Sequence, residues 1–98
     1  MEKKIIRRKY RFTGRVQGVG FRYTARKLAL EYGLTGYVKN ETDGTVTMEL
    51  QGNPWDIEMV IIGLENHVLI DIEKCTKEDL SVNPDEKVFF IDACCSYI

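Results

Sequence analysis

A glycine-rich stretch, Gly14-Arg15-Val16-Gln17-Gly18-Val19-Gly20-Phe21-Arg22, joins a strand-like pattern to a helix-like pattern in this 98-residue chain. Glycine allows backbone N–H groups to turn toward one side, around a bound anion. The helix that begins at the end of the stretch adds the positive end of its dipole, and the Arg22 guanidinium can bind an anion through two parallel hydrogen bonds. We therefore predict an anion-binding loop between a strand and a helix.

The sequence on either side of this loop has the periodicity of a strand and of a helix. Residues 6–13 alternate, with one apolar and one basic face: Ile6, Tyr10 and Phe12 against Arg7, Lys9 and Arg11. This predicts a half-buried strand whose basic face is solvated. The helix has an apolar stripe made of Phe21, Ala25, Leu28, Ala29 and Tyr32. Gly33 is expected to end it.

A hairpin is predicted next. Residues 35–40 contain strand-forming side chains, and residues 45–51 alternate strictly between apolar and polar. The Asp43-Gly44 pair between them is typical of a tight turn.

The last third of the chain predicts a second helix and two further strands. Asn53 and Pro54 are typical of a helix start, and an apolar stripe follows them: Ile57, Val60, Ile61 and Leu64. Alternation over residues 68–72 predicts a fourth strand. Residues 76–86 indicate a polar connection, and residues 88–92 a final strand.

The resulting order, β-α-β-β-α-β with the fourth-strand region split into two strands, predicts an α+β fold of the ferredoxin-like split βαβ type. In that arrangement an antiparallel sheet carries both helices on one face. We expect a single domain over residues 1–98 with a core from about residue 7 to residue 92. Because this fold hosts many unrelated functions, only the site can indicate which one applies.

Composition restricts the class of protein. Hydrophobic residues make up 44% and charged residues 30% of the chain, and no apolar run approaches the roughly 18 residues of a membrane helix. Three cysteines, including adjacent Cys94 and Cys95, form neither a disulfide framework nor a metal-ligand pattern, and the single histidine, His67, has no ligand at metal spacing. We expect a cytoplasmic protein without a membrane segment or a metal site, with His67 in a surface turn.

Charge is distributed unevenly although the net charge is only −1. Residues 1–39 hold eleven Lys and Arg but two acidic residues, whereas residues 40–98 hold three and thirteen. This asymmetry favours an anionic ligand on the N-terminal part.

Two further motifs follow the glycine-rich stretch: Gly36-Tyr37-Val38-Lys39-Asn40 and Asp43-Gly44-Thr45-Val46. In order and spacing the three motifs together resemble the acylphosphatase family. The resemblance implies a metal-independent, cofactor-free hydrolase that acts on the carboxyl–phosphate anhydride of a small-molecule acyl phosphate. It implies that Arg22 binds the phosphate and that Asn40 positions the attacking water. It also implies a backbone cradle within the 16–22 loop, formed by Gln17, Gly18, Val19, Gly20 and Phe21.

These implied roles suit the chemistry of the substrate. A carboxylate is a good leaving group and needs little general acid, so positioning and charge stabilisation can carry the reaction. The Asn40 side chain has an acceptor and a donor but no useful basicity, so it can orient a water without deprotonating it. A phosphate oxygen can take the proton instead.

The chain departs from the family at three places. Tyr37 stands where members often have tryptophan, and Asp92 stands where an arginine is common. The chain then continues as a short tail over residues 93–98, and in some members a chain-end carboxylate lies close to the catalytic arginine. In this chain, the carboxylate of Ile98 would have to lie close to Arg22 in the same way.

Three alternatives stay open at this point. The first is a non-catalytic anion-binding or regulatory module on the same fold. The second is a piece that resembles the N-terminal domain of hydrogenase-maturation carbamoyltransferases, against which the lack of zinc-finger cysteines argues. The third is binding of nucleic acid by the basic N-terminal part, but no aromatic string of the RNA-binding type is present. We expect a monomer with no nucleic-acid partner.

Overall fold

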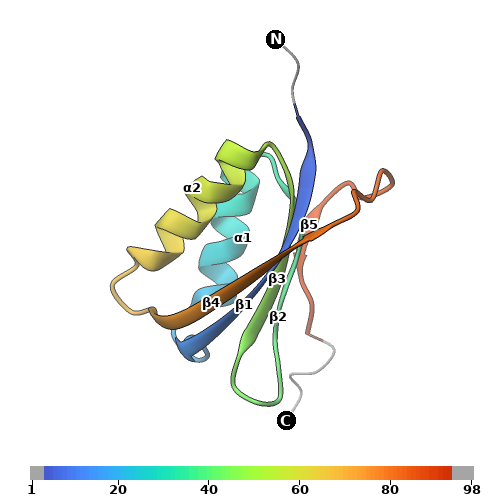
Figure 1. Cartoon of the computed structure of the whole chain (residues 1–98). Helices are drawn as coiled ribbons and strands as arrows, with labels where there is room; N and C mark the ends of the chain where they lie inside the picture. Colours follow the sequence, from blue (N-terminus) through green and yellow to red (C-terminus); the bar gives the residue numbers. More distant parts are fainter. Residues whose placement is uncertain (1–3, 94–98) are drawn as a thin grey trace.

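The computed structural model describes residues 4–93. Its elements are β1 (Ile6–Arg15), α1 (Phe21–Glu31), β2 (Thr35–Asn40), β3 (Val46–Gly52), α2 (Pro54–Glu65), β4 (Asp71–Leu80) and β5 (Phe89–Ile91). The strands form one sheet in the order β4-β1-β3-β2-β5, and both helices cover the same face of it (Figure 1). The predicted α+β ferredoxin-like architecture is confirmed.

The pairing of the fifth strand makes the sheet mixed. β1 pairs antiparallel with β3 and β4, and β2 pairs antiparallel with β3, as predicted. β5 instead lies parallel to β2, with Phe90 opposite Tyr37 and Ile91 opposite Val38. The prediction of a purely antiparallel sheet is therefore wrong at one edge, where the three-residue β5 lies parallel to β2.

The core lies between the sheet and the two helices. The predicted inner face of β1 is confirmed, since Tyr10 and Phe12 are buried, and the Phe12 ring lies 4.9 Å from that of Phe21 at the start of α1. The predicted stripe of α2 is buried throughout: Ile57, Val60, Ile61 and Leu64. The apolar face of α1 thus fixes the position of the helix start against β1.

Both predicted helix boundaries are confirmed by their capping geometry. At the end of α1, Gly33 has φ 69°, its N–H donates to the Leu30 carbonyl, and the Leu34 N–H donates to the Ala29 carbonyl at 2.9 Å. This is the Schellman arrangement that favours glycine. At the start of α2, the Asn53 side chain accepts a hydrogen bond from the Trp55 N–H at 2.8 Å.

The fourth strand lies further along the chain than predicted. Val68 is 90% exposed and belongs to a turn, with His67 beside it as expected, whereas β4 extends over residues predicted to be a polar connection. β4 is an edge strand and is exposed along almost its whole length. Because neither face of such a strand is fully covered, its sequence lacks the apolar alternation on which the prediction depended.

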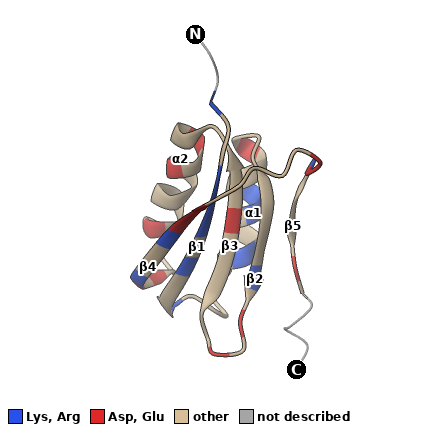
Figure 2. Ribbon diagram, turned by 45° about the vertical axis from the view of Figure 1, so that its right-hand side comes forward, with Lys and Arg blue, Asp and Glu red and all other residues tan. Residues whose placement is uncertain are grey.

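Part of the uneven charge of the sequence is balanced within the fold, where basic and acidic residues lie on neighbouring elements (Figure 2). The fold brings the basic β1 beside acidic residues of the β2–β3 turn, of α2 and of β4. Arg8 pairs with Glu58 and Asp79, and Arg11 pairs with Asp43. Part of the basic character of β1 is therefore used in ion pairs within the protein.

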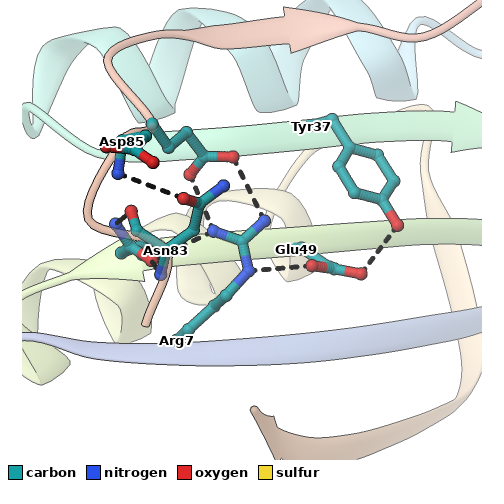
Figure 3. A network of polar contacts seen from close by, with 7 residues as sticks. Arg7, Tyr37, Glu49, Asn83 and Asp85 are labelled. Atoms are coloured by element: carbon teal, nitrogen blue, oxygen red, sulfur yellow. Dashed lines mark hydrogen bonds and ion pairs between the residues drawn. The ribbon is translucent and has the colours of Figure 1, made fainter. Parts of the chain in front are cut away.

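Arg7 lies at the centre of a polar network on the open face of the sheet (Figure 3). It is only 7% exposed, so the predicted solvated position is wrong. Its guanidinium donates to Glu49 at 2.8 Å and to both carboxylate oxygens of Glu86 at 2.8 and 3.1 Å. Tyr37 donates to the other Glu49 oxygen at 2.7 Å, and burial together with this bond raises the pKa of Tyr37.

The same network holds the connection between β4 and β5 against the sheet. The Gln51 side chain donates to the Asn83 carbonyl and accepts from the Asn83 N–H, at 2.9 and 2.7 Å. With the Arg7–Glu86 pair, these bonds fix the segment that leads into β5, and hence the place of Ile91 beside β2.

Candidate active site

The loop between β1 and α1 has the backbone conformation that its glycines allow. Gly18 and Gly20 have φ values of 74° and 82°, in the left-handed region that favours glycine. A Cβ at either position would meet open space, so the backbone conformation is what favours glycine at both. Val16 is fully buried and anchors the loop in the core.

The N–H groups of this loop and of the first turn of α1 are free to bind a ligand. Within residues 4–93, no backbone N–H of residues 17–23 has a protein acceptor, and the first to be bonded is that of Thr24, which donates to the Gly20 carbonyl at 3.0 Å. The first turn of α1 has no acidic side chain that would compete for them. Such an array, at the positive end of a helix, favours an anion.

A cavity of about 280 Å³ opens beside this loop. It is lined by Val16, Gly18, Gly20, Phe21, Arg22, Tyr23, Asn40 and Ile91. Arg22 comes from the first turn of α1 and Asn40 from the end of β2, so the cavity lies between a helix start and a strand end. Among residues 4–93 the partly buried Arg22 side chain has no hydrogen-bond or ion-pair partner.

Asn40 has a polar atom that no described residue satisfies. Its Oδ1 is buried and has no hydrogen-bond donor within residues 4–93. Because a buried acceptor without a donor is costly, such an atom at a cavity wall indicates a place where a donor from a ligand or a water binds.

Gln17 connects the loop to the hairpin turn that follows Asn40. Its Nε2 donates to the Glu41 carbonyl at 2.8 Å and to the Thr45 carbonyl at 2.9 Å. The two carbonyls flank the turn, and Glu41 is the residue directly after Asn40. This side chain therefore fixes the distance between the glycine loop and the end of β2.

The structure brings most of the predicted site residues to one place. Arg22, Asn40, Gly18, Gly20 and Phe21 line the same cavity, whereas Gln17 and Val19 belong to the loop but do not line it. The Phe21 ring is buried in the core, so its backbone is the part available to a ligand.

Two lining residues, Tyr23 and Ile91, were not predicted, whereas Val16 begins the predicted 16–22 loop. The adjacency of Tyr23 to Arg22 is a signal that could have indicated it. Nothing in the sequence near Ile91 does so, because its place depends on the parallel pairing of β5 with β2.

The described residues contain no cluster of three or more His, Cys, Asp or Glu side chains suited to holding a metal ion. In the same part of the chain, neither helix has the length and apolar character of a membrane-spanning segment.

Comparison with known proteins identifies the family. A model of the acylphosphatase family matches residues 8–91. This chain belongs to the acylphosphatase family. It is 44% identical over 79 residues to an acylphosphatase of Geobacillus thermodenitrificans, a match that covers 80% of this chain and 84% of the relative. The names of the curated relatives support the conclusion that this member is an enzyme.

Solved structures agree with this assignment. The crystal structure of acylphosphatase from Bacillus subtilis matches with a TM-score of 0.82 at 26% identity, over 89% of this chain and 98% of that one. Full-length HypF, solved in a phosphate- and nucleotide-bound form, matches with a TM-score of 0.84 at 31% identity, over 94% of this acylphosphatase-family chain but only 12% of its own.

Two of the departures from the family fall in different parts of the structure. Tyr37 packs beside Phe90, with the ring centres 6.0 Å apart, on the open face of the sheet. Asp92 directly follows β5, and its N–H donates to the Val38 carbonyl at 2.8 Å. The carboxylate of Ile98, considered above as a partner of Arg22, lies outside the described residues.

Proposed function

We propose that this protein hydrolyses the carboxyl–phosphate bond of small acyl phosphates to a carboxylate and inorganic phosphate. The observation that carries the proposal is that one cavity joins three groups without a hydrogen-bond partner among residues 4–93: the N–H groups around Gly18 and Gly20, the Arg22 guanidinium, and the Oδ1 of Asn40. Each of these has a use in phosphoryl transfer.

The phosphate binds at the loop and the helix start. Backbone N–H groups from residues 17–22 donate to its nonbridging oxygens, and the Arg22 guanidinium adds two charge-assisted hydrogen bonds. These donors are fixed before the substrate arrives, so they can stabilise the charge as it rearranges in the transition state without further reorganisation.

Asn40 holds the attacking water. Its buried Oδ1 accepts a hydrogen bond from the water and directs the water lone pair at phosphorus. The leaving carboxylate departs on the opposite side of the phosphorus atom. The proton of the water passes to a phosphate oxygen, since Asn40 is not a base.

The reaction as proposed needs no metal, and the site is contributed by a single copy of the chain. The donors that would stabilise the phosphate are backbone N–H groups and one arginine. We therefore also propose that the protein acts as a monomer, and from its cysteine usage that it acts in the cytoplasm.

Hydrolysis of benzoyl phosphate in EDTA, beside a phosphate-monoester control, tests the proposal. The wild type is expected to hydrolyse only the anhydride. Asn40→Ala should lower kcat about 100-fold or more while inhibition by inorganic phosphate is nearly retained. Arg22→Ala should weaken both turnover and phosphate inhibition, the latter about 10-fold or more.

Matched controls exist for both variants. Arg26 lies one turn further along α1 and is exposed, and Asn66 is exposed at the end of α2. Arg26→Ala and Asn66→Ala should leave kcat and phosphate inhibition unchanged. A well-folded wild type without anhydride hydrolysis would contradict the proposal and leave an anion-binding module as the better account.

A further inference from the structure

Part of the cavity surface is apolar and is not needed to bind the phosphate. Of its four apolar lining side chains, Val16 and Phe21 are 0% and 2% exposed and form its floor. Tyr23 is 69% exposed and Ile91 is partly exposed, so these two are the ones that a ligand can touch.

The two accessible apolar side chains come from different walls. Ile91 is in β5 and lies opposite Val38 of β2, two residues before Asn40, so it belongs to the same wall as the proposed water site. Tyr23 comes from the first turn of α1 and directly follows Arg22. Tyr23 therefore lies on the helix wall, beside the proposed phosphate position.

The in-line geometry of the reaction indicates which of these two walls lies beside the acyl group. In an in-line displacement the water and the leaving group lie on opposite sides of phosphorus. If Asn40 holds the water at the β2 wall, the acyl group extends toward the α1 wall. We infer that Tyr23 contacts the acyl group of the substrate and that this subsite selects acyl phosphates with a small, flat, apolar acyl group; the inference depends on the proposed function.

The size and charge of the cavity support this substrate class. A volume of about 280 Å³ is slightly below the usual range of about 300–1,000 Å³ for ligand sites, which favours a compact acyl group. Within the described part of the chain, Arg22 is the only charged residue that lines the cavity, and the phosphate uses it. A second charge on the acyl group would find no partner there, whereas an aromatic ring can pack against the Tyr23 ring.

The test compares benzoyl phosphate with acetyl phosphate. Both substrates present the same phosphate to Arg22 and Asn40, so the ratio of their kcat/KM values isolates the contact with the acyl group from effects on the rest of the site. Tyr23→Ala should lower this benzoyl-to-acetyl ratio by about 2- to 10-fold, and Tyr23→Phe should retain it, because the ring is the contact. Leu30→Ala is the control, since Leu30 is also an exposed apolar residue of α1 but does not line the cavity.

The outcomes separate the two proposals. If the wild type hydrolyses neither substrate, the proposed function fails and the acyl subsite fails with it. If both substrates are hydrolysed and Tyr23→Ala leaves the ratio unchanged, or Leu30→Ala lowers it equally, the hydrolase stands and the subsite at Tyr23 is refuted. Tyr23 is largely exposed, so its replacement by Ala is expected to fold, and thermal unfolding of the variant checks this.

Discussion

Replacement of Gln17 by alanine tests whether the hydrogen bonds between the glycine loop and the hairpin turn are needed for turnover. The change removes two hydrogen bonds, of 2.8 and 2.9 Å, that the side chain donates to the Glu41 and Thr45 carbonyls. Neither carbonyl is left without a donor, because Glu41 still accepts from the Gly44 N–H and Thr45 from the Glu41 N–H. The expected loss in the free energy of unfolding is therefore small, about 1–2 kcal/mol.

The expected effect of Gln17→Ala on turnover is larger than its effect on stability. Without the tie, Asn40 can shift relative to the loop, and a misplacement of about 1 Å can cost up to about 100-fold in rate. We expect kcat for benzoyl phosphate to fall about 10- to 100-fold, with inhibition by inorganic phosphate nearly unchanged. The measurement is steady-state hydrolysis well below the unfolding temperature of each variant.

A double variant separates positioning from a general loss of structure. If Gln17 acts through Asn40, adding Gln17→Ala to Asn40→Ala should cost little more than Asn40→Ala alone. Thr42→Ala, an exposed change in the same turn, is the control and should leave kcat unchanged. Fully multiplicative losses in the double variant, or a Gln17→Ala enzyme with wild-type kcat, would refute this reasoning.

Two further predictions concern the hairpin. Gly36→Ala should destabilise the protein severely, because at φ 137° its Cβ would collide with the Glu49 carbonyl. Gly44→Ala, at φ 93° with open space around the Cβ, should lower the free energy of unfolding by only about 1 kcal/mol. Similar unfolding temperatures for the two variants would contradict this. The Thr45 hydroxyl, then the Thr45 N–H, and then Arg11 hold the pKa of Asp43 near 2, below its ordinary 3.8. The contribution of this carboxylate to stability is therefore present above about pH 3.8 and is lost as the pH falls through about 2. NMR titration of the wild type should give the low value and Thr45→Val a higher one; an equal midpoint in the two proteins would count against the assignment.

The elements with one buried face were predictable from the sequence. β1, α1, the hairpin and α2 each have a clear period, and Gly33 and Asn53 marked helix ends by chemistry that acts within a few residues. β4 was misplaced because an exposed edge strand needs no apolar face. The final strand was predicted over residues 88–92 and lies at Phe89–Ile91. Its parallel pairing with β2 could not be predicted, since this pairing depends on a connection held by tertiary contacts.

The candidate site was predictable where its residues form one continuous motif. Arg22 and the loop glycines are adjacent in sequence, and the structure places them at one cavity with Asn40. The hydrogen bonds from the Gln17 side chain to the hairpin turn were not predicted, because their acceptors lie 24 and 28 residues away in sequence. Arg7 was assigned to a solvated face for the same reason, since its partners Glu49 and Glu86 are 42 and 79 residues distant.

The central place of β1 has a consequence for how the chain folds. The first strand of the chain lies between β3 and β4, and Arg7 is paired with Leu80, 73 positions later. Closing so long a loop costs conformational entropy before the contact stabilises anything, so domains with distant pairings fold more slowly than those with local ones. During synthesis, β1 leaves the ribosome well before either of its neighbours. Both edges of this basic, half-apolar strand can therefore be paired only after β3 and then β4 have emerged.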